Sequence, residues 1–260
     1  MRRIILHEWL APPLDADVDI LDVRGQTSAL LHHFVLYSTT DEEPVGTKRP
    51  PEDSDRITLG LRFCGGVGGD SQGALQLPDG VVFRLAKGRS LITNVHYINT
   101  SAKAVVGRGW IDVKLAPAAP ERKPAGMFTS VEPAIAVAPH AESTLDVSCT
   151  MQHDVNLIAW TNHMHELGAS VFTEVERTSG TIEEIRRDDA WQYEWALDPQ
   201  FTQWPLKKPF KLHAGDVVHT RCVWNNPGPD LITFPREMCL GLGFFVGPKD
   251  VTCSSGKWLE

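Results

Sequence analysis

Residues 155–160 read Val-Asn-Leu-Ile-Ala-Trp, and residues 161–165 continue as Thr-Asn-His-Met-His. The β-branched and aromatic side chains of this run favour a pleated strand over a helix. Similar runs recur while helical periodicity is scarce, and they cover residues 18–23, 34–37, 81–85, 91–98, 110–115, 171–175, 217–223 and 240–246. The sequence therefore predicts an all-β protein.

Turn-forming residues separate these runs. Gly, Asn, Asp and Pro tolerate the tight or positive-φ backbone that hairpins require, and they cluster at residues 78–80, 179–180, 214–216 and 225–228. Short strands separated by such turns are typical of antiparallel β-sandwiches. A proline-rich stretch at residues 116–124 follows the strand predicted at 110–115. We therefore predict two sandwich domains, residues 1–117 and 125–260.

The composition excludes several classes of protein. The 260 residues are 42% hydrophobic and 22% charged, enough to bury a core, and the formal net charge is −8. Because no basic stripe stands out, we expect no nucleic-acid partner. The longest apolar runs, such as residues 240–246, are far shorter than the roughly 20 residues of a membrane-spanning helix. We expect no membrane span.

Compartment and cysteine pairing are linked. The chain starts with the positive charge of a signal peptide, but the apolar stretch ends at His7. We expect an exported protein, periplasmic or extracellular, whose leader is absent from this chain; a cytoplasmic protein is the alternative. Four of the five cysteines, an even set that predicts two disulfides, lie in the second half, and Cys64 lies alone in the first. Buried free thiols are the alternative, and four cysteines allow three pairings.

Two histidines and a methionine in the second half suggest a metal site. His163 and His165 occupy alternate positions, which project from the same face of a strand, so both imidazoles can bind one ion. Met238, beside Cys239 on a distant strand, could supply a flexible thioether. Two imidazoles and a thioether form a soft ligand set that favours copper.

Three histidines in the first half suggest a second site. His32 and His33 are adjacent and would face opposite sides of a regular strand, so binding one ion together requires a bulge or a strand end. His96, in the run at residues 91–98, is the natural third imidazole. We interpret the remaining histidines as structural or exposed; they are His7, His140, His153, His213 and His219.

Two other segments carry no catalytic motif. Residues 64–69 are glycine-rich but lack the Gly-Lys-Ser/Thr of a phosphate loop, so we interpret them as a flexible connection. Residues 41–55 are acidic and proline-rich, have no apolar rhythm, and are interpreted as a mobile surface loop. We also expect the first strands of the chain to be abbreviated.

The order and spacing of five motifs carry a family resemblance. They lie at residues 31–37, 95–97, 163–168, 215–222 and 237–239. Together they resemble the copper type II, ascorbate-dependent monooxygenases, a family that includes the peptidylglycine-hydroxylating and dopamine-hydroxylating enzymes. The resemblance runs over most of the chain, from about residue 17 to residue 253. It implies two jelly-roll-like antiparallel β-sandwich domains that face each other across a cleft, with one copper in each.

The resemblance also assigns roles to the predicted ligands. His32, His33 and His96 match the copper that relays an electron. His163, His165 and Met238 match the copper that binds dioxygen and takes hydrogen from a substrate C–H bond. The disulfides implied by the resemblance join Cys149 to Cys253 and Cys222 to Cys239.

The reaction implied by this family consumes R–H, dioxygen and two electrons from ascorbate or another reductant, and yields R–OH and water. The partners are then dioxygen and a small molecule or an exposed side chain. The alternatives are a copper-binding protein of the same fold that has no oxygenase activity, and a metal-free β-sandwich binding module.

The chain departs from the pattern of the peptidylglycine enzymes. Those enzymes carry an arginine two residues before the first histidine of His-x-His, and an asparagine and a tyrosine shortly after the Met-Cys pair. The corresponding residues here are Thr161, Leu240 and Leu242. Without the arginine, a carboxylate loses its bidentate anchor. We therefore expect the substrate not to be a C-terminal glycine peptide, but a neutral or partly apolar molecule or side chain.

Overall fold

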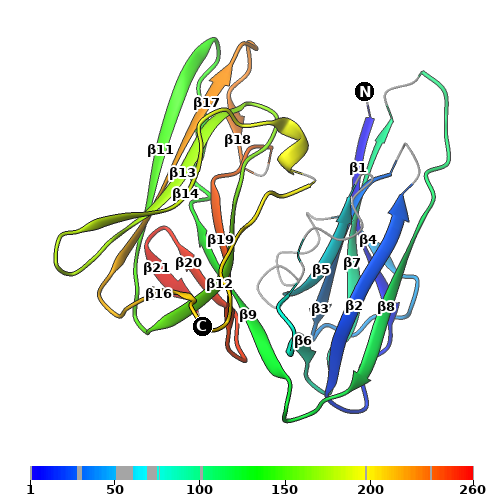
Figure 1. Cartoon of the computed structure of the whole chain (residues 1–260). Helices are drawn as coiled ribbons and strands as arrows, with labels where there is room; N and C mark the ends of the chain where they lie inside the picture. Colours follow the sequence, from blue (N-terminus) through cyan, green and yellow to red (C-terminus); the bar gives the residue numbers. More distant parts are fainter. Residues whose placement is uncertain are drawn as a thin grey trace. The chain divides into compact units, whose positions relative to one another are not determined.

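The computed structural model describes residues 2–27, 31–50, 61–68, 75, 77–99, 102–196, 198–234 and 236–259. Nearly all regular structure in these residues is strand; they contain a single short 3-10 helix, η2 (Tyr193–Ala196). The all-β prediction is confirmed. The chain divides into two compact units, Met1–Pro124 and Ala125–Glu260 (Figure 1). That each unit is one copper domain stays a prediction.

Unit 1 contains a five-stranded antiparallel sheet of order β4-β1-β7-β3-β5. Strand β2 pairs with β6 and β8 outside this sheet. Buried Phe34 and Val95 pack with Tyr97 and with Ile111 of β8. The strands are β1 (Arg2–Ala11), β2 (Val18–Thr27), β3 (Leu31–Thr39), β4 (Lys48–Arg49), β5 (Arg62–Gly68), β6 (Val81–Leu85), β7 (Ser90–Asn99) and β8 (Gly109–Pro117).

Three sequence interpretations of this unit need correction. Residues 64–68 are no flexible connection, because they belong to β5, which pairs with β3. The glycines permit close approach: a Cβ on Gly65 would lie 3.0 Å from Val23 Cγ2, and one on Gly66 would lie 3.3 Å from the Phe34 carbonyl oxygen. Residue 69 lies outside the described residues. The pairing of β5 with β3 therefore outweighs the low β-propensity of the glycines.

The first strands are not abbreviated, since β1 and β2 each span 10 residues. The first part of the predicted mobile loop is tied to β1: the Trp9 amide donates to the Thr47 carbonyl at 3.1 Å, and the Gly46 amide donates to the Trp9 carbonyl at 2.8 Å. Residues 51–55 lie outside the described residues. Backbone pairing, which composition does not reveal, holds residues 41–50.

Unit 2 is a sandwich of two main sheets, beside which residues 136–137 and 232–233 form a small two-stranded sheet. One has the order β11-β17-β13-β14, and in the other β12 lies between β15 and β19, with β9 beyond β19. The strands are β9 (Lys123–Val131), β10 (Ala136–Val137), β11 (Ala141–Thr150), β12 (Val155–His163), β13 (Gly168–Glu176), β14 (Ile182–Asp188), β15 (Thr202–Gln203), β16 (Phe210–Leu212), β17 (Val217–Asn226), β18 (Ile232–Thr233), β19 (Leu240–Val246), β20 (Val251–Ser254) and β21 (Lys257–Leu259).

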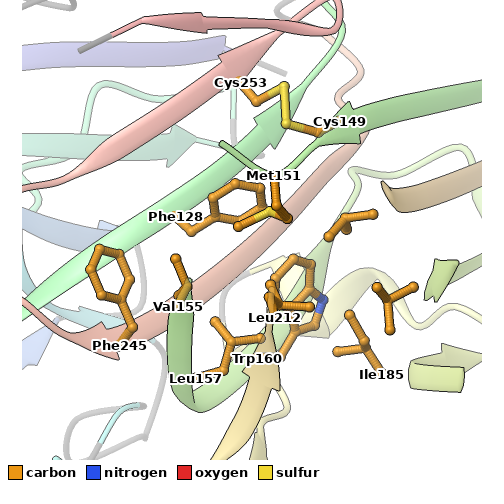
Figure 2. Close-up of a cluster of buried hydrophobic side chains, with 12 residues drawn as sticks. Phe128, Cys149, Met151, Val155, Leu157, Trp160, Ile185, Leu212, Phe245 and Cys253 are labelled. Carbon is orange, nitrogen blue, oxygen red and sulfur yellow. A yellow bond between two sulfur atoms is a disulfide. The ribbon is translucent and has the colours of Figure 1, made fainter. Parts of the chain in front are cut away.

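The core of unit 2 fills the space between the two sheets. Figure 2 shows Phe128, Leu157, Trp160 and Phe245 among the buried side chains of this cluster. The Cys149–Cys253 disulfide lies in the same cluster (Figure 2). A second disulfide joins Cys222 of β17 to Cys239. Both pairings implied by the family resemblance are therefore confirmed, and buried Cys64 belongs to neither disulfide.

Candidate metal centre

The end of β12 brings His163 and His165 together. His163 is the last residue of β12 and lies opposite Leu240, the first residue of β19. The ring centroids of His163 and His165 are 5.0 Å apart, and the ring planes are nearly perpendicular, at 87°. Two imidazoles whose nitrogens each lie about 2 Å from one metal ion have centroids at a similar separation. The pair therefore fits a shared ion.

His165 is fixed at three of its atoms. Its amide donates to the carboxylate of Glu237 at 3.1 Å, and its carbonyl accepts from Trp191 Nε1 at 3.0 Å. Its ring Nδ1 lies 2.9 Å from the carbonyl oxygen of Arg236. A carbonyl can only accept, so Nδ1 carries the proton and Nε2 is the nitrogen with a lone pair for a metal.

Glu237 joins the two ligand segments. Its side chain is fully buried and accepts from the amides of His165 and Leu167 and from Trp224 Nε1, at 3.1, 2.7 and 3.0 Å. Burial raises the pKa of Glu237, and the donated hydrogen bonds oppose that rise. Sequence reasoning assigned Glu237 and Trp191 no role. The triplet of Glu237, Met238 and Cys239 was visible, but a glutamate beside a methionine does not reveal that it is buried.

Met238 is held on both sides. On one side Glu237 and Arg236 contact His165; on the other, fully buried Cys239 is bonded to Cys222 of β17. Met238 itself is half-buried and lies two residues before Leu240, the partner of His163. The three predicted ligands of this set therefore belong to segments that contact one another.

The environment of His163 keeps its imidazole neutral. Burial lowers the pKa of His163 to about 3, with a smaller electrostatic contribution from the neighbouring imidazole of His165. A neutral imidazole is the form that binds a metal. The donor set and its protonation therefore suit a soft ion such as copper.

The backbone of unit 1 places the other predicted ligands on adjacent strands. His33 of β3 lies opposite His96 of β7. The register shifts between Leu31 and His33, so β3 has the irregularity that joint ligation by His32 and His33 requires. The side chains of His32, His33 and His96 lie outside what the structure describes.

The remaining histidines have other partners. His7 is 5% exposed, and its Nε2 lies 2.9 Å from Asn94 Nδ2. His219 contacts Ser148 at 2.9 Å. Across the residues whose side chains are described, no three His, Cys, Asp or Glu residues form a metal-binding group. The set of His163, His165 and Met238 contributes only two such residues, because its third donor is a thioether.

The sheet face beside His163 is uncharged. Strand pairing places Thr161 opposite Leu242 and His163 opposite Leu240. The alternate residues Trp160 and Phe128 point into the core. The other residues of this face at paired positions are Ala159, Phe244, Met127, Thr129, Val131, Gln203, Thr252 and Ser254. Phe201 extends the face, because its ring lies 6.0 Å from that of Phe244.

A β-sandwich unit with two imidazoles and a thioether on contacting segments defines a candidate copper-binding unit. Residues 124–245 match the family described as copper type II ascorbate-dependent monooxygenase, C-terminal domain. Peptidyl-glycine alpha-amidating monooxygenase A from Xenopus laevis is 27% identical over 247 residues, which cover 87% of this chain and 24% of that protein. Both comparisons support a relationship to the copper type II, ascorbate-dependent monooxygenase family.

The chain spans about a quarter of the length of this curated relative. Among solved structures, PNGF-II is 8% identical with a TM-score of 0.33, covering 94% of this chain and 59% of that chain. The structure of infectious bursal disease virus, Gx strain, is 8% identical with a TM-score of 0.26, covering 94% and 68%. These two likenesses carry no argument about function.

Proposed function

We propose that this protein is a dicopper monooxygenase that hydroxylates a substrate C–H bond with dioxygen and an external reductant such as ascorbate. The observation that carries the proposal is the pair of hydrogen bonds from His165 to Glu237 and Arg236. These bonds join the His-x-His segment to the residues that precede Met238. The similarity to the copper type II, ascorbate-dependent monooxygenases supports the chemistry, since copper and ascorbate dependence characterise that family.

In this proposal, His163, His165 and Met238 hold the copper where substrate reacts, and His32, His33 and His96 hold the electron-relay copper. Copper supplies one-electron chemistry and dioxygen binding when it is present. The protein orients the ligands: Arg236 fixes the tautomer of His165, and Glu237 fixes its backbone. A weak thioether beside two imidazoles favours the reduced ion.

We infer that the substrate has no carboxylate beside its reacting carbon. The paired residues Thr161, Leu242 and Leu240, which flank His163, offer no cation to bind an anion. On this face, the half-buried side chains of Leu240, Leu242 and Phe201 are apolar and suit a neutral, partly apolar molecule or side chain. A C-terminal glycine peptide therefore does not suit this face.

We further propose an exported protein, periplasmic or extracellular. Its two disulfides are typical of oxidising compartments. No helix among the described residues is long and apolar enough to span a membrane.

Copper K-edge X-ray absorption on the ascorbate-reduced, copper-loaded chain tests the ligand sets. We expect two coppers per chain and a sulfur scatterer that disappears in Met238→Ile. Met151→Ile is the matched control, because Met151 is buried in the core cluster and its loss should leave the sulfur signal unchanged. Absence of sulfur, or a single copper, would refute the two-site proposal.

Turnover is tested separately with neutral aromatic and aliphatic substrates and with N-acylglycines. We expect dioxygen and ascorbate consumption coupled to hydroxylation of a neutral substrate. Two bound coppers with no coupled consumption would favour a copper-binding protein of the same fold. Faster hydroxylation of an N-acylglycine would overturn the substrate inference alone.

A further inference from the structure

A buried polar network lies directly behind the predicted copper ligand His163. Its central residue is Asn162, which is 1% exposed and points away from the His163 face of β12. Its neighbours Trp160, Thr173 and Thr220 are fully buried, and Asp188 is 5% exposed. The core-facing residues around it, such as Trp160 and Leu157, are apolar. A polar residue here requires a complete set of partners.

Both polar atoms of the Asn162 side chain have partners. Its Oδ1 accepts from Trp160 Nε1 at 3.1 Å and from Thr173 Oγ1 at 2.7 Å, and its Nδ2 donates to Asp188 at 2.9 Å. The amide orientation is fixed, because a flipped amide would place its NH2 against the Trp160 donor. Arg186 pairs with Asp188 and completes the network.

The network bridges the two sheets of unit 2. Asn162 belongs to the β12 sheet, whereas Thr173 of β13, Asp188 of β14 and Thr220 of β17 belong to the other. Thr173 and Thr220 hydroxyls are 3.0 Å apart. Gly241, opposite Asn162, leaves room, since a Cβ there would lie 2.9 Å from Thr220 Oγ1.

The two predicted ligand segments involve both sheets. His163 ends β12 and pairs with Leu240 of β19 in the same sheet, whereas the segment of Glu237 to Cys239, which leads into β19, is also tied to β17 of the other sheet through Trp224 and Cys222. Apolar contacts between the sheets lack direction, but hydrogen bonds across them are directional. A bridge one residue from His163 therefore fixes where its imidazole lies relative to His165 and Met238.

We propose that Asn162 is a positioning residue for the copper site: it locks the two sheets together at His163, so that His163 meets the His165 and Met238 segment in a geometry that binds Cu(I). This inference rests on the proposed function, because it requires His163 to be a copper ligand.

The test compares three full-length variants loaded with Cu(I). Asn162→Leu removes the bridge, and Thr173→Val removes one of its bonds. Asp216→Asn is the matched control, because Asp216 is 2% exposed and binds Arg177 and His213 at the opposite end of β17. Copper affinity is measured by competition with a Cu(I) chelator. The sulfur contribution to the K-edge spectrum reports how much copper remains at the sulfur-containing site. The infrared stretch of bound carbon monoxide reports the ligand geometry.

We expect Asn162→Leu to weaken Cu(I) binding at the sulfur-containing site by about 10- to 100-fold, as outer residues of metal sites do. Its carbon monoxide band should shift or broaden, and Thr173→Val should change both readouts less, in the same direction. Asp216→Asn should lower stability but change neither readout.

Wild-type affinity and an unchanged band in both Asn162→Leu and Thr173→Val would overturn the inference. If Asn162→Leu does not fold, Thr173→Val alone decides. A wild-type chain without sulfur-bound copper would overturn the proposed function, and with it this inference, so the two failures are distinguishable.

Discussion

The ring Nδ1 of His165 donates a hydrogen bond of 2.9 Å to the carbonyl oxygen of Arg236. Arg236 lies two residues before Met238, so the bond that fixes the tautomer of one predicted ligand also fixes the segment that carries another. Histidine ligands commonly donate their second nitrogen to such a carbonyl. The arrangement explains why residues 71 positions apart in sequence meet without a regular strand pair between them.

Glu237→Gln should destabilise unit 2 and weaken the sulfur-containing site. Both carboxylate oxygens of Glu237 accept N–H donors, from Leu167 on one oxygen and from His165 and Trp224 on the other. The amide NH2 would face one donor and leave it unsatisfied, at a cost of about 1–3 kcal/mol. Urea unfolding measures the stability, and Cu(I) competition measures the site. Glu142→Gln, at an exposed position, is the control, and equal values for both variants would contradict the prediction.

Removal of either disulfide should lower stability, but removal of only one of them should also weaken copper binding. Removing Cys222–Cys239, whose sequence separation is 17, should cost about 3 kcal/mol by loop entropy, and Cys149–Cys253, with a separation of 104, about 4–5 kcal/mol. Only the first adjoins Met238. We expect the paired alanine variant at 222 and 239 to weaken the sulfur scatterer. The pair at 149 and 253 should lose more stability but keep that signal; loss of sulfur in both would contradict the prediction.

The sequence predicted strands wherever apolar patterning was strong. Every run named from composition lies within a strand, including residues 155–160 in β12 and 240–246 in β19. The missed strands had weak patterns. β1 begins with two arginines, yet it pairs with β7 along almost its whole length. β9 contains Pro124 and Gly126 and forms seven residue pairs with β19. Long-range pairing, which local propensity does not contain, creates these strands.

The candidate site was likewise predictable from the sequence only in part. Alternation along a strand predicted that His163 and His165 could share an ion, and their rings lie 5.0 Å apart. The support for these residues was not predictable. Glu237, Trp191 and Asn162 act through burial and long-range hydrogen bonds, and no local pattern distinguishes them from exposed residues.

The three-histidine site should depend on His96 but not on His7. His33 and His96 are directly opposed on β3 and β7, and the register shift at Leu31 permits His32 to join them. We expect His96→Ala to reduce the copper content from two ions to one while keeping the sulfur scatterer. His7→Ala is the matched control, because buried His7 lies on the adjacent strand β1 and bonds Asn94. Two coppers in His96→Ala would refute this ligand set.

Unit 1 should lose stability in acid through Asp19. This fully buried carboxylate pairs with Arg84 and Arg122. Burial alone would raise the pKa of Asp19, but hydrogen bonds from the two guanidinium groups and the Ala119 amide outweigh it and hold the pKa below its ordinary value of 3.8. A depressed carboxyl pKa stabilises the folded state above the unfolded value. That contribution is lost as the pH falls below 3.8 through the folded value.

Asp19→Asn should therefore remove this acid-sensitive component and also lower stability near neutral pH. We expect a loss of about 3 kcal/mol at pH 7, the lower part of the range for breaking a buried ion pair, because both arginines are about one-quarter exposed. Urea unfolding from about pH 5 to about pH 2 should show a smaller fall in free energy than in the wild type. Asp15→Asn, at an exposed position nearby, should retain the wild-type pH dependence. An identical acid profile in Asp19→Asn and the wild type would show that another carboxylate controls acid unfolding.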